Sequence, residues 1–155
     1  MKTKYRSKID LWVGILLGAA VIAMLFSALE IIDSGESWWS ILLPLALALG
    51  VTIFTLSLLT NTYYTISNES IFIRMGPFRW TIPLEEIDLI EPSRKAWSSA
   101  ALSLDRLYIE YSRKDEGSKS EIYISPVDKD RFMRDAADRD PNLIYDGERV
   151  AKDDS

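Results

Sequence analysis

The hydrophobic positions of the chain form two long runs near its beginning and shorter, alternating runs after them. Residues 11–29 contain nineteen consecutive positions without a charge, and residues 37–73 contain one charged residue, Glu69. A transmembrane helix needs about 20 mostly apolar residues to cross a hydrocarbon core roughly 30 Å thick. The pattern therefore predicts two membrane-spanning helices, at residues 11–32 and 38–60.

A polar loop at residues 33–37 joins the two predicted spans and forces them to run antiparallel. Four cations lie in residues 1–10 and none lies in the loop. By the positive-inside rule, residues 1–10 form a basic cytoplasmic N-terminus, the loop is external, and both ends of a multi-pass plasma-membrane protein are cytoplasmic. A cleaved signal peptide is the alternative for the first run, but its length and the second run directly after it argue against one.

Small residues in the spans predict close helix packing. Gly14 and Gly18 are four residues apart in the first span, and Gly50 offers a matching notch in the second. Such spacing lets two helix backbones approach closely. We favour packing of the hairpin against itself, and a homo-oligomer or a membrane-protein partner remains the alternative.

The period of the pattern changes after residue 60. Alternating runs at residues 62–67, 70–75 and 78–82 predict three antiparallel strands, and further strands are expected at 102–112 and 121–125. Leu84, Ile87 and Ile90 repeat at helical spacing, which predicts a short helical turn at most. Ser125 and Pro126 are typical of an N-cap and first helical position, so a helix is expected from there to Pro141. Its inner stripe would be Phe132, Met133, Ala136 and Ala137, and residues 141–155 would form an acidic tail.

Several stretches in this part resemble a known family. They are YYTI at residues 63–66, IFIRMGP at 71–77, IPL at 82–84, SSAALSLDRLYIEY at 98–111 and ISP at 124–126. In order and spacing they are similar to the short bacterial pleckstrin-homology (PH)-like proteins with two N-terminal spans, the YyaB-like group. The resemblance implies a membrane α-helical hairpin followed by an α+β, mainly-β PH-like domain at residues 61–140, in which a curved antiparallel sheet is closed by a C-terminal helix. It implies no catalytic residue.

The charge of this domain limits the partners that it could bind. Residues 61–155 carry 14 Lys+Arg and 19 Asp+Glu, which accounts for the whole net charge of −5, and this acidity argues against nucleic acid as a partner. Local cations and aromatics offer a site for lipid headgroups or a protein partner, at Arg74, Arg79, Trp80, Arg94, Lys95 and Trp97. A solvated, mixed surface is the plainer interpretation of these residues.

The chain has no cysteine and no histidine. These absences remove thiolate and imidazole chemistry and zinc sites of the Cys/His type, and we expect no catalytic residue, metal or cofactor. The serines of residues 98–103 have no evident base, and tight packing explains them more simply than a phosphate site. The predicted function is a non-catalytic binding or scaffolding module on the lipid bilayer. Protein–protein assembly is the first hypothesis, and binding of inner-leaflet lipid headgroups by residues 79–97 is the alternative.

Overall fold

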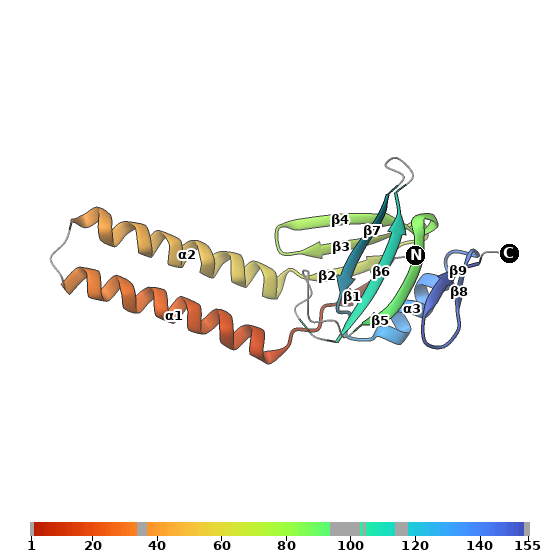
Figure 1. Cartoon of the computed structure of the whole chain (residues 1–155), viewed down its shortest axis with the longest axis horizontal. Helices are drawn as coiled ribbons and strands as arrows, with labels where there is room; N and C mark the ends of the chain where they lie inside the picture. The colour runs from red at the N-terminus through yellow and green to blue at the C-terminus, as the bar shows by residue number, and fades with distance from the viewer. Residues whose placement is uncertain (1, 34–36, 94–102, 104, 114–117, 154–155) are drawn as a thin grey trace.

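The computed structural model describes residues 2–33, 37–93, 103, 105–113 and 118–153. Two helices project from one end of a domain made of two antiparallel sheets and a third helix (Figure 1). The first sheet has the order β1-β2-β3-β4, with bounds Thr3–Arg6, Tyr63–Ile66, Ser70–Met75 and Phe78–Pro83. The second has the order β7-β6-β5-β9-β8, with bounds Lys119–Ile124, Arg106–Ser112, Ile87–Ser93, Val150–Lys152 and Leu143–Tyr145. The helices are α1 (Leu11–Asp33), α2 (Trp38–Thr60), the single turn η1 (Leu84–Glu86) and α3 (Lys129–Ala137).

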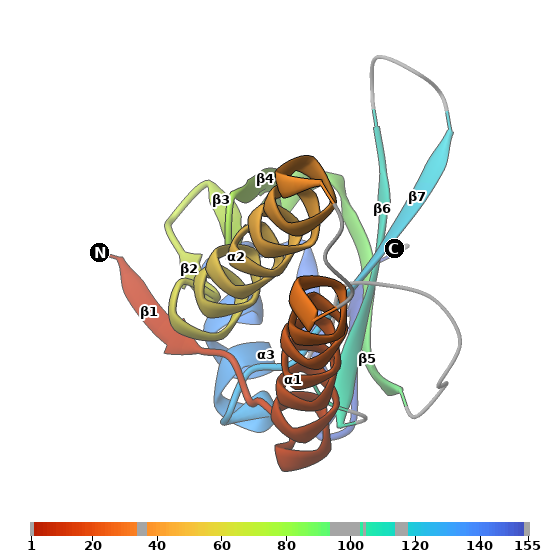
Figure 2. The ribbon, with the colours of Figure 1, turned by 90° about the vertical axis from the view of Figure 1, so that its left-hand side faces the viewer.

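Helices α1 and α2 run side by side and antiparallel, as both views show (Figures 1 and 2). Their most buried residues are Val13 on α1 and Ala48 and Thr55 on α2, whereas most of their large apolar side chains are exposed. Within the described residues, α2 is long and apolar enough to cross a membrane, and the apolar run Leu11–Ser27 of α1 is shorter.

The predicted packing of the hairpin through its glycines is wrong. A Cβ atom built on Gly14, Gly18 or Gly50 would meet nothing within 4 Å. The buried residues among those described on α2 are Ala48 and Thr55, which lie seven positions apart on one side of the helix. Gly50 is exposed and lies two positions from Ala48, on another side of the helix.

The two helices are inserted between two paired strands of one sheet. β1 precedes α1, β2 follows α2, and the two strands pair antiparallel from Thr3↔Ile66 to Arg6↔Tyr63. The N-terminal segment was expected to be only a charged flank of the first span, and this expectation is wrong. Tyr5 points into the core while its neighbours Lys4 and Arg6 point outward, so the segment has the alternation of a half-buried strand.

The predicted meander at residues 62–82 is confirmed as β2, β3 and β4. Alternate residues of these strands, among them Tyr64, Ile73 and Ile82, are buried. The predicted helical turn is confirmed only in part, because η1 ends at Glu86 and β5 begins at Ile87. A register shift between Ile87 and Leu89 disturbs the two-residue alternation of β5, which explains why the strand was missed.

Helix α3 closes the core but begins later than expected. Its N-cap is Asp128, whose side chain accepts a hydrogen bond from the Arg131 backbone N–H, instead of Ser125. The predicted inner stripe is confirmed, and Phe132 packs edge-on against Tyr5 at 5.1 Å and Tyr64 at 6.4 Å between ring centroids. The helix thus contacts both strands that flank the inserted hairpin.

The C-terminal segment is part of the second sheet, so the predicted acidic tail is wrong as far as Lys152. β8 and β9 form a hairpin, and β9 pairs with β5 through Leu89↔Ala151 and Ile90↔Val150. Leu143 and Val150 are buried in the core. Each strand is only three residues long, too short for its alternation to stand out among the surrounding acidic residues.

Candidate functional site

A row of basic residues crosses the outer face of the four-stranded sheet. The strand register places Arg6 opposite Tyr63, Tyr63 opposite Arg74, and Arg74 opposite Arg79. Residues directly opposite one another in neighbouring strands share a face of the sheet. This row lies on the outer face because the inner face holds Tyr64 and Ile73.

A second row on the same face adds further cations. Lys4 is opposite Thr65, and its Nζ atom lies 3.8 Å from the centroid of the Tyr63 ring, a cation–π contact. Beside these residues is a shallow hollow of about 460 Å³, lined by Lys2, Tyr63, Thr65, Ser67, Ser70, Phe72 and Thr81. We call the five basic residues of this surface the cationic face: Lys2, Lys4, Arg6, Arg74 and Arg79.

The cationic face is not neutralised from within the described part of the chain. The outward residues of β1–β4 include no acid, and Glu69 lies in the turn between β2 and β3. No ion pair links any of the five cations to a described acidic side chain. The Arg74 guanidinium lowers the pKa of the Tyr63 hydroxyl by hydrogen bonding, and the charges of Lys4 and Arg79 lower it further. Tyr63 is half-buried, and the hydrogen bond and the charges that lower its pKa all come from basic residues of this face.

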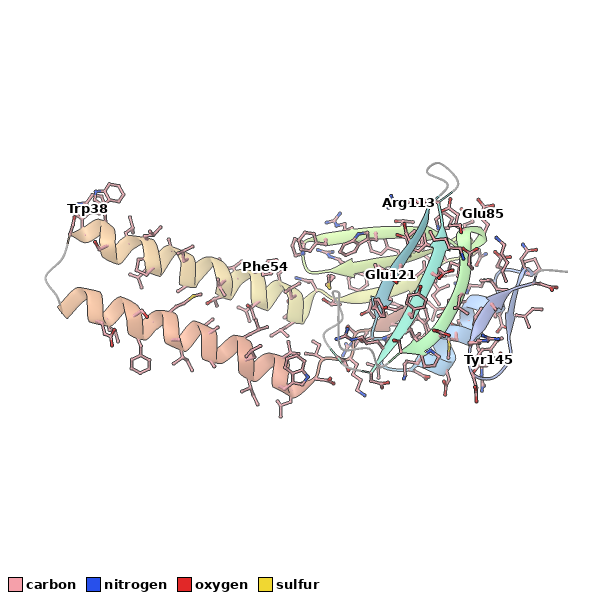
Figure 3. All side chains as sticks on the ribbon, viewed as in Figure 1. Trp38, Phe54, Glu85, Arg113, Glu121 and Tyr145 are labelled. Carbon is pink, nitrogen blue, oxygen red and sulfur yellow. The ribbon has the colours of Figure 1, made fainter. Side chains whose placement is uncertain are left out.

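The basic row lies at the end of the sheet that adjoins the helices. The β3–β4 turn packs against α2: Gly76 adopts φ +55°, and a Cβ atom there would lie 3.0 Å from the Leu58 side chain and 3.3 Å from its backbone nitrogen. One turn further along α2, the rings of Phe54 and Phe78 contact edge-on at 6.4 Å (Figure 3). The tip of this strand pair therefore lies alongside the last turns of α2.

The structure brings together some of the predicted contact residues and separates others. Arg74 and Arg79 are direct cross-strand partners. Trp80, next to Arg79, is on the inner face, where it packs against the core and lies 5.9 Å from Phe78 between ring centroids. Adjacent strand residues point to opposite faces, which a grouping by sequence proximity overlooked. Three predicted residues lie outside the described part of the chain: Arg94, Lys95 and Trp97.

The cations of β1 were missed as site residues because they were interpreted as a membrane flank. Their alternation with Thr3 and Tyr5 was the signal that could have found them. With residues 1–10 included, the domain's net charge changes from −5 to −2. The folded domain is thus more basic near the helices than residues 61–155 alone suggest.

The outer face of the five-stranded sheet is acidic. Glu91 is opposite Tyr108, which is opposite Tyr123, and Glu110 is directly opposite Glu121. Lys119 donates to Glu110 at 2.7 Å, and this bond lowers the pKa of Glu110. We call Glu91, Glu110 and Glu121 the acidic face.

Polar contacts fix the start of α1 to the second sheet. The Lys8 backbone N–H donates to the Ser125 carbonyl at 2.6 Å, and buried Ser103 donates to the Asp10 carboxylate at 2.8 Å. Asp105 pairs with Lys129 and, at 3.0 Å, with Lys8, and these two bonds lower its pKa, Lys129 more strongly. Ser103 therefore has a structural role, and the other serines predicted with it, at 98 and 99, lie outside the described residues.

Comparison with known families supports the architecture. A family model for the bacterial PH domain matches residues 62–139, half of the chain. The chain belongs to this family. PH domains are generally non-catalytic modules that bind proteins or lipid headgroups, and the PH domain of this chain carries the two sheets and α3 described above. The matched region begins after α2 and ends before β8, so β1, the helical pair and the β8–β9 hairpin lie outside it. No curated protein and no solved structure matches the chain.

Proposed function

We propose that this protein is a membrane-anchored, non-catalytic binding module. In this proposal α1 and α2 cross the plasma membrane as a hairpin, as in the YyaB-like proteins that the chain resembles. The PH domain then lies at the cytoplasmic face. The observation that carries the proposal is the insertion of an apolar helical pair between paired strands β1 and β2, which makes anchor and domain one folded unit.

The dimensions and surface of the helical pair support the anchoring. Each helix has 23 residues, which at about 1.5 Å per residue is roughly 34 Å, enough for a hydrocarbon core of about 30 Å. Exposed apolar residues cover both helices. Such a large apolar surface is unfavourable in water and favourable in the hydrocarbon core of a bilayer. Trp38 and Trp39 stack at the loop end of α2, and Trp12 lies near the other end of the pair, as expected of interfacial aromatics.

Protein–protein assembly is the role that we propose first for the anchored module. Two surfaces are suited to it. β4 is an edge strand of its sheet among the described strands, and the glycine sides of α1 and α2 point away from the hairpin seam. An edge strand can extend its sheet with a partner's strand, and small residues let a second pair of helices approach closely.

Single-cysteine labelling tests the anchoring and its orientation cleanly, because the natural chain has no cysteine. Ser37→Cys lies at the loop end of the hairpin and Asn68→Cys in the exposed β2–β3 turn. With a membrane-impermeant maleimide on intact cells, we expect Ser37→Cys to react and Asn68→Cys to react only after permeabilisation. The opposite pattern would reverse the orientation, and release of the protein by alkaline carbonate would refute the anchoring.

Crosslinking in membranes tests assembly. We expect the parent chain to give crosslinked dimers and Gly14→Leu/Gly18→Leu to lose them, with Ala20→Leu, another exposed position on α1, as the matched control. Absence of dimers in the parent, or equal dimers in all three chains, would refute self-association through α1.

A further inference from the structure

We infer that the cationic face binds the phosphate headgroups of anionic phospholipids, in the leaflet from which α1 and α2 emerge. The inference rests on the proposed membrane anchoring and adds the ligand class and the site. It differs from the sequence-based lipid hypothesis in its residues, because three of the five cations precede the helices and Trp80 is not among them.

The position of the basic row relative to the helices supports this inference. Tyr63 is the third residue after the end of α2, so at about 3.3 Å per residue it lies at most roughly 10 Å beyond the helix. Arg74 and Arg79 lie nearer, because the tip beside them packs on Leu58 of α2. The headgroup layer extends about 5–8 Å beyond the hydrocarbon core on each side. Arg6, Arg74 and Arg79 share this row, and long basic side chains extend toward an interface with their charged ends. Their guanidinium groups can therefore reach lipid phosphates.

The side chains of the cationic face also have the chemistry that phosphate binding requires. Arginine presents planar, paired donors that match phosphate oxygens, and lysine adds positive charge. Tyr63 lies between Lys4 and Arg74, with the Lys4 ammonium 3.8 Å and the Arg74 guanidinium carbon 5.9 Å from its ring centroid. The adjoining hollow presents the side-chain hydroxyls of Thr65 and Thr81, whereas those of Ser67 and Ser70 hydrogen-bond to each other in the β2–β3 turn. Charge and hydroxyl donors thus lie side by side, as a phosphate–glycerol headgroup requires.

The β3–β4 tip is exposed and apolar, and its place beside α2 also supports lipid binding. Phe78 is 48% exposed although it contacts Phe54 of α2, and Pro77 beside it is exposed as well. With α2 in the bilayer, Phe54 lies six residues inside the helix end, so the tip reaches the boundary between headgroups and hydrocarbon. Aromatic side chains favour this boundary. Arg74 and Arg79, directly behind the tip, then lie at phosphate depth.

A protein with an acidic surface is the other class of ligand that a basic face can attract. The row of Arg6, Arg74 and Arg79 lies at the strand ends next to the helices, where the bilayer surface would meet the domain, and this proximity favours lipid. Tethering also raises the effective headgroup concentration, so that weak individual contacts suffice.

The test uses the full chain in detergent micelles that contain equal amounts of phosphatidylglycerol and phosphatidylcholine of the same acyl length. Native mass spectrometry counts how many of each lipid remain bound per chain. We expect the parent to retain phosphatidylglycerol preferentially and Arg74→Gln/Arg79→Gln to lower that preference by about tenfold or more. Each basic residue near an anionic surface contributes about fivefold, the equivalent of roughly 1 kcal/mol.

Arg131→Gln/Arg134→Gln is the matched control. It removes two exposed arginines from α3 and changes the net charge by the same amount. We expect it to keep the parent's preference within about twofold. Thermal unfolding of each variant confirms that its domain is folded.

Two results would overturn the inference: an unchanged preference in Arg74→Gln/Arg79→Gln, or an equal loss in both double variants. Absence of any preference in the parent, together with loss of a crosslinked acidic protein from Arg74→Gln/Arg79→Gln in cells, would assign the face to a protein instead. Maleimide labelling at Ser37 in the same variants separates this inference from the proposed function. A chain that is inserted but shows no lipid preference refutes only the inference, and a chain that is not inserted refutes the proposed function.

Discussion

The two sheets of the PH domain share one core but carry opposite charge on their outer faces. The four-stranded sheet presents five cations and no described acid, and the five-stranded sheet presents Glu91, Glu110 and Glu121. The difference originates in β1, which comes from before the helices and adds its cations to a sheet whose other strands supply only Arg74 and Arg79. Inserting the helical pair between β1 and β2 thus places positive charge beside the helices.

With the proposed anchoring, this separation of charge would let an acidic protein lie against an anionic membrane surface. A net charge of −5 would be repelled by an anionic leaflet if it were spread evenly. Here the basic face adjoins the helices, and the acidic face belongs to the other sheet. In the proposed membrane arrangement, the distribution of charge, more than its sum, would determine which surface faces the lipid.

The largest expected effect on stability comes from removing the side chain that holds β1 in the four-stranded sheet. Tyr5 is 7% exposed, contacts Phe132, and donates to the Asp135 carboxylate at 2.5 Å. We expect Tyr5→Ala to lower the free energy of unfolding by about 3–5 kcal/mol through loss of a buried ring. Denaturant unfolding of the detergent-solubilised chain, followed by tryptophan fluorescence, measures it.

Lys4→Ala, the adjacent outward residue of β1, is the control, and we expect it to change stability by less than about 0.5 kcal/mol. Equal stability of Tyr5→Ala and Lys4→Ala would mean that β1 does not belong to the folded sheet.

A second substitution tests the other sheet in the same way. Leu143 on β8 is 5% exposed, and its neighbour Ile144 is 52% exposed. We expect Leu143→Ala to cost about 2–4 kcal/mol and Ile144→Ala less than about 0.5 kcal/mol, because only the first creates a cavity. If both variants unfold at the parent's denaturant midpoint, the C-terminal hairpin is not part of the five-stranded sheet.

A substitution at Gly76 tests the contact between the four-stranded sheet and α2. An alanine there must adopt a left-handed backbone and approach Leu58, so we expect Gly76→Ala to cost about 2 kcal/mol. In a Leu58→Ala background the side-chain contact is absent, and the cost should fall to about 1 kcal/mol. Identical costs in the two backgrounds, from a double-mutant cycle, would show that the β3–β4 tip does not press on Leu58.

The smallest effect is expected at Asp105, where the second sheet holds the start of α1. Its side chain is 42% exposed, so Asp105→Asn should cost less than about 1 kcal/mol at pH 7. Because the pKa of Asp105 is lowered from 3.8 in the folded state, its contribution is present above pH 3.8 and is lost as the pH falls through the lowered value. Unfolding curves at pH 7 and pH 3 measure this, and a stability difference that grows toward acid would contradict the ion pairs.

The local pattern of apolar and polar residues predicted the parts of the fold that are continuous in sequence. The meander β2–β4 and the inner stripe of α3 follow from alternation and helical period within one segment. The pairing of β1 with β2 could not be predicted in this way, because 56 residues separate Arg6 from its continuation at Tyr63. For the same reason three of the five cations of the site were missed: Arg74 and Arg79 were identified, while Lys2, Lys4 and Arg6 were assigned to the membrane flank.

In the proposed arrangement, the end of the four-stranded sheet nearest the helices lies against the lipid headgroups. Site-directed fluorescence in nanodiscs tests it directly, with a label at Pro77→Cys on the β3–β4 tip or at Glu121→Cys on the acidic face. Phosphatidylglycerol nanodiscs doped with a headgroup-attached quencher should strongly quench the label at position 77 and hardly affect the label at 121. Equal quenching at both positions, or stronger quenching at 121, would contradict the account.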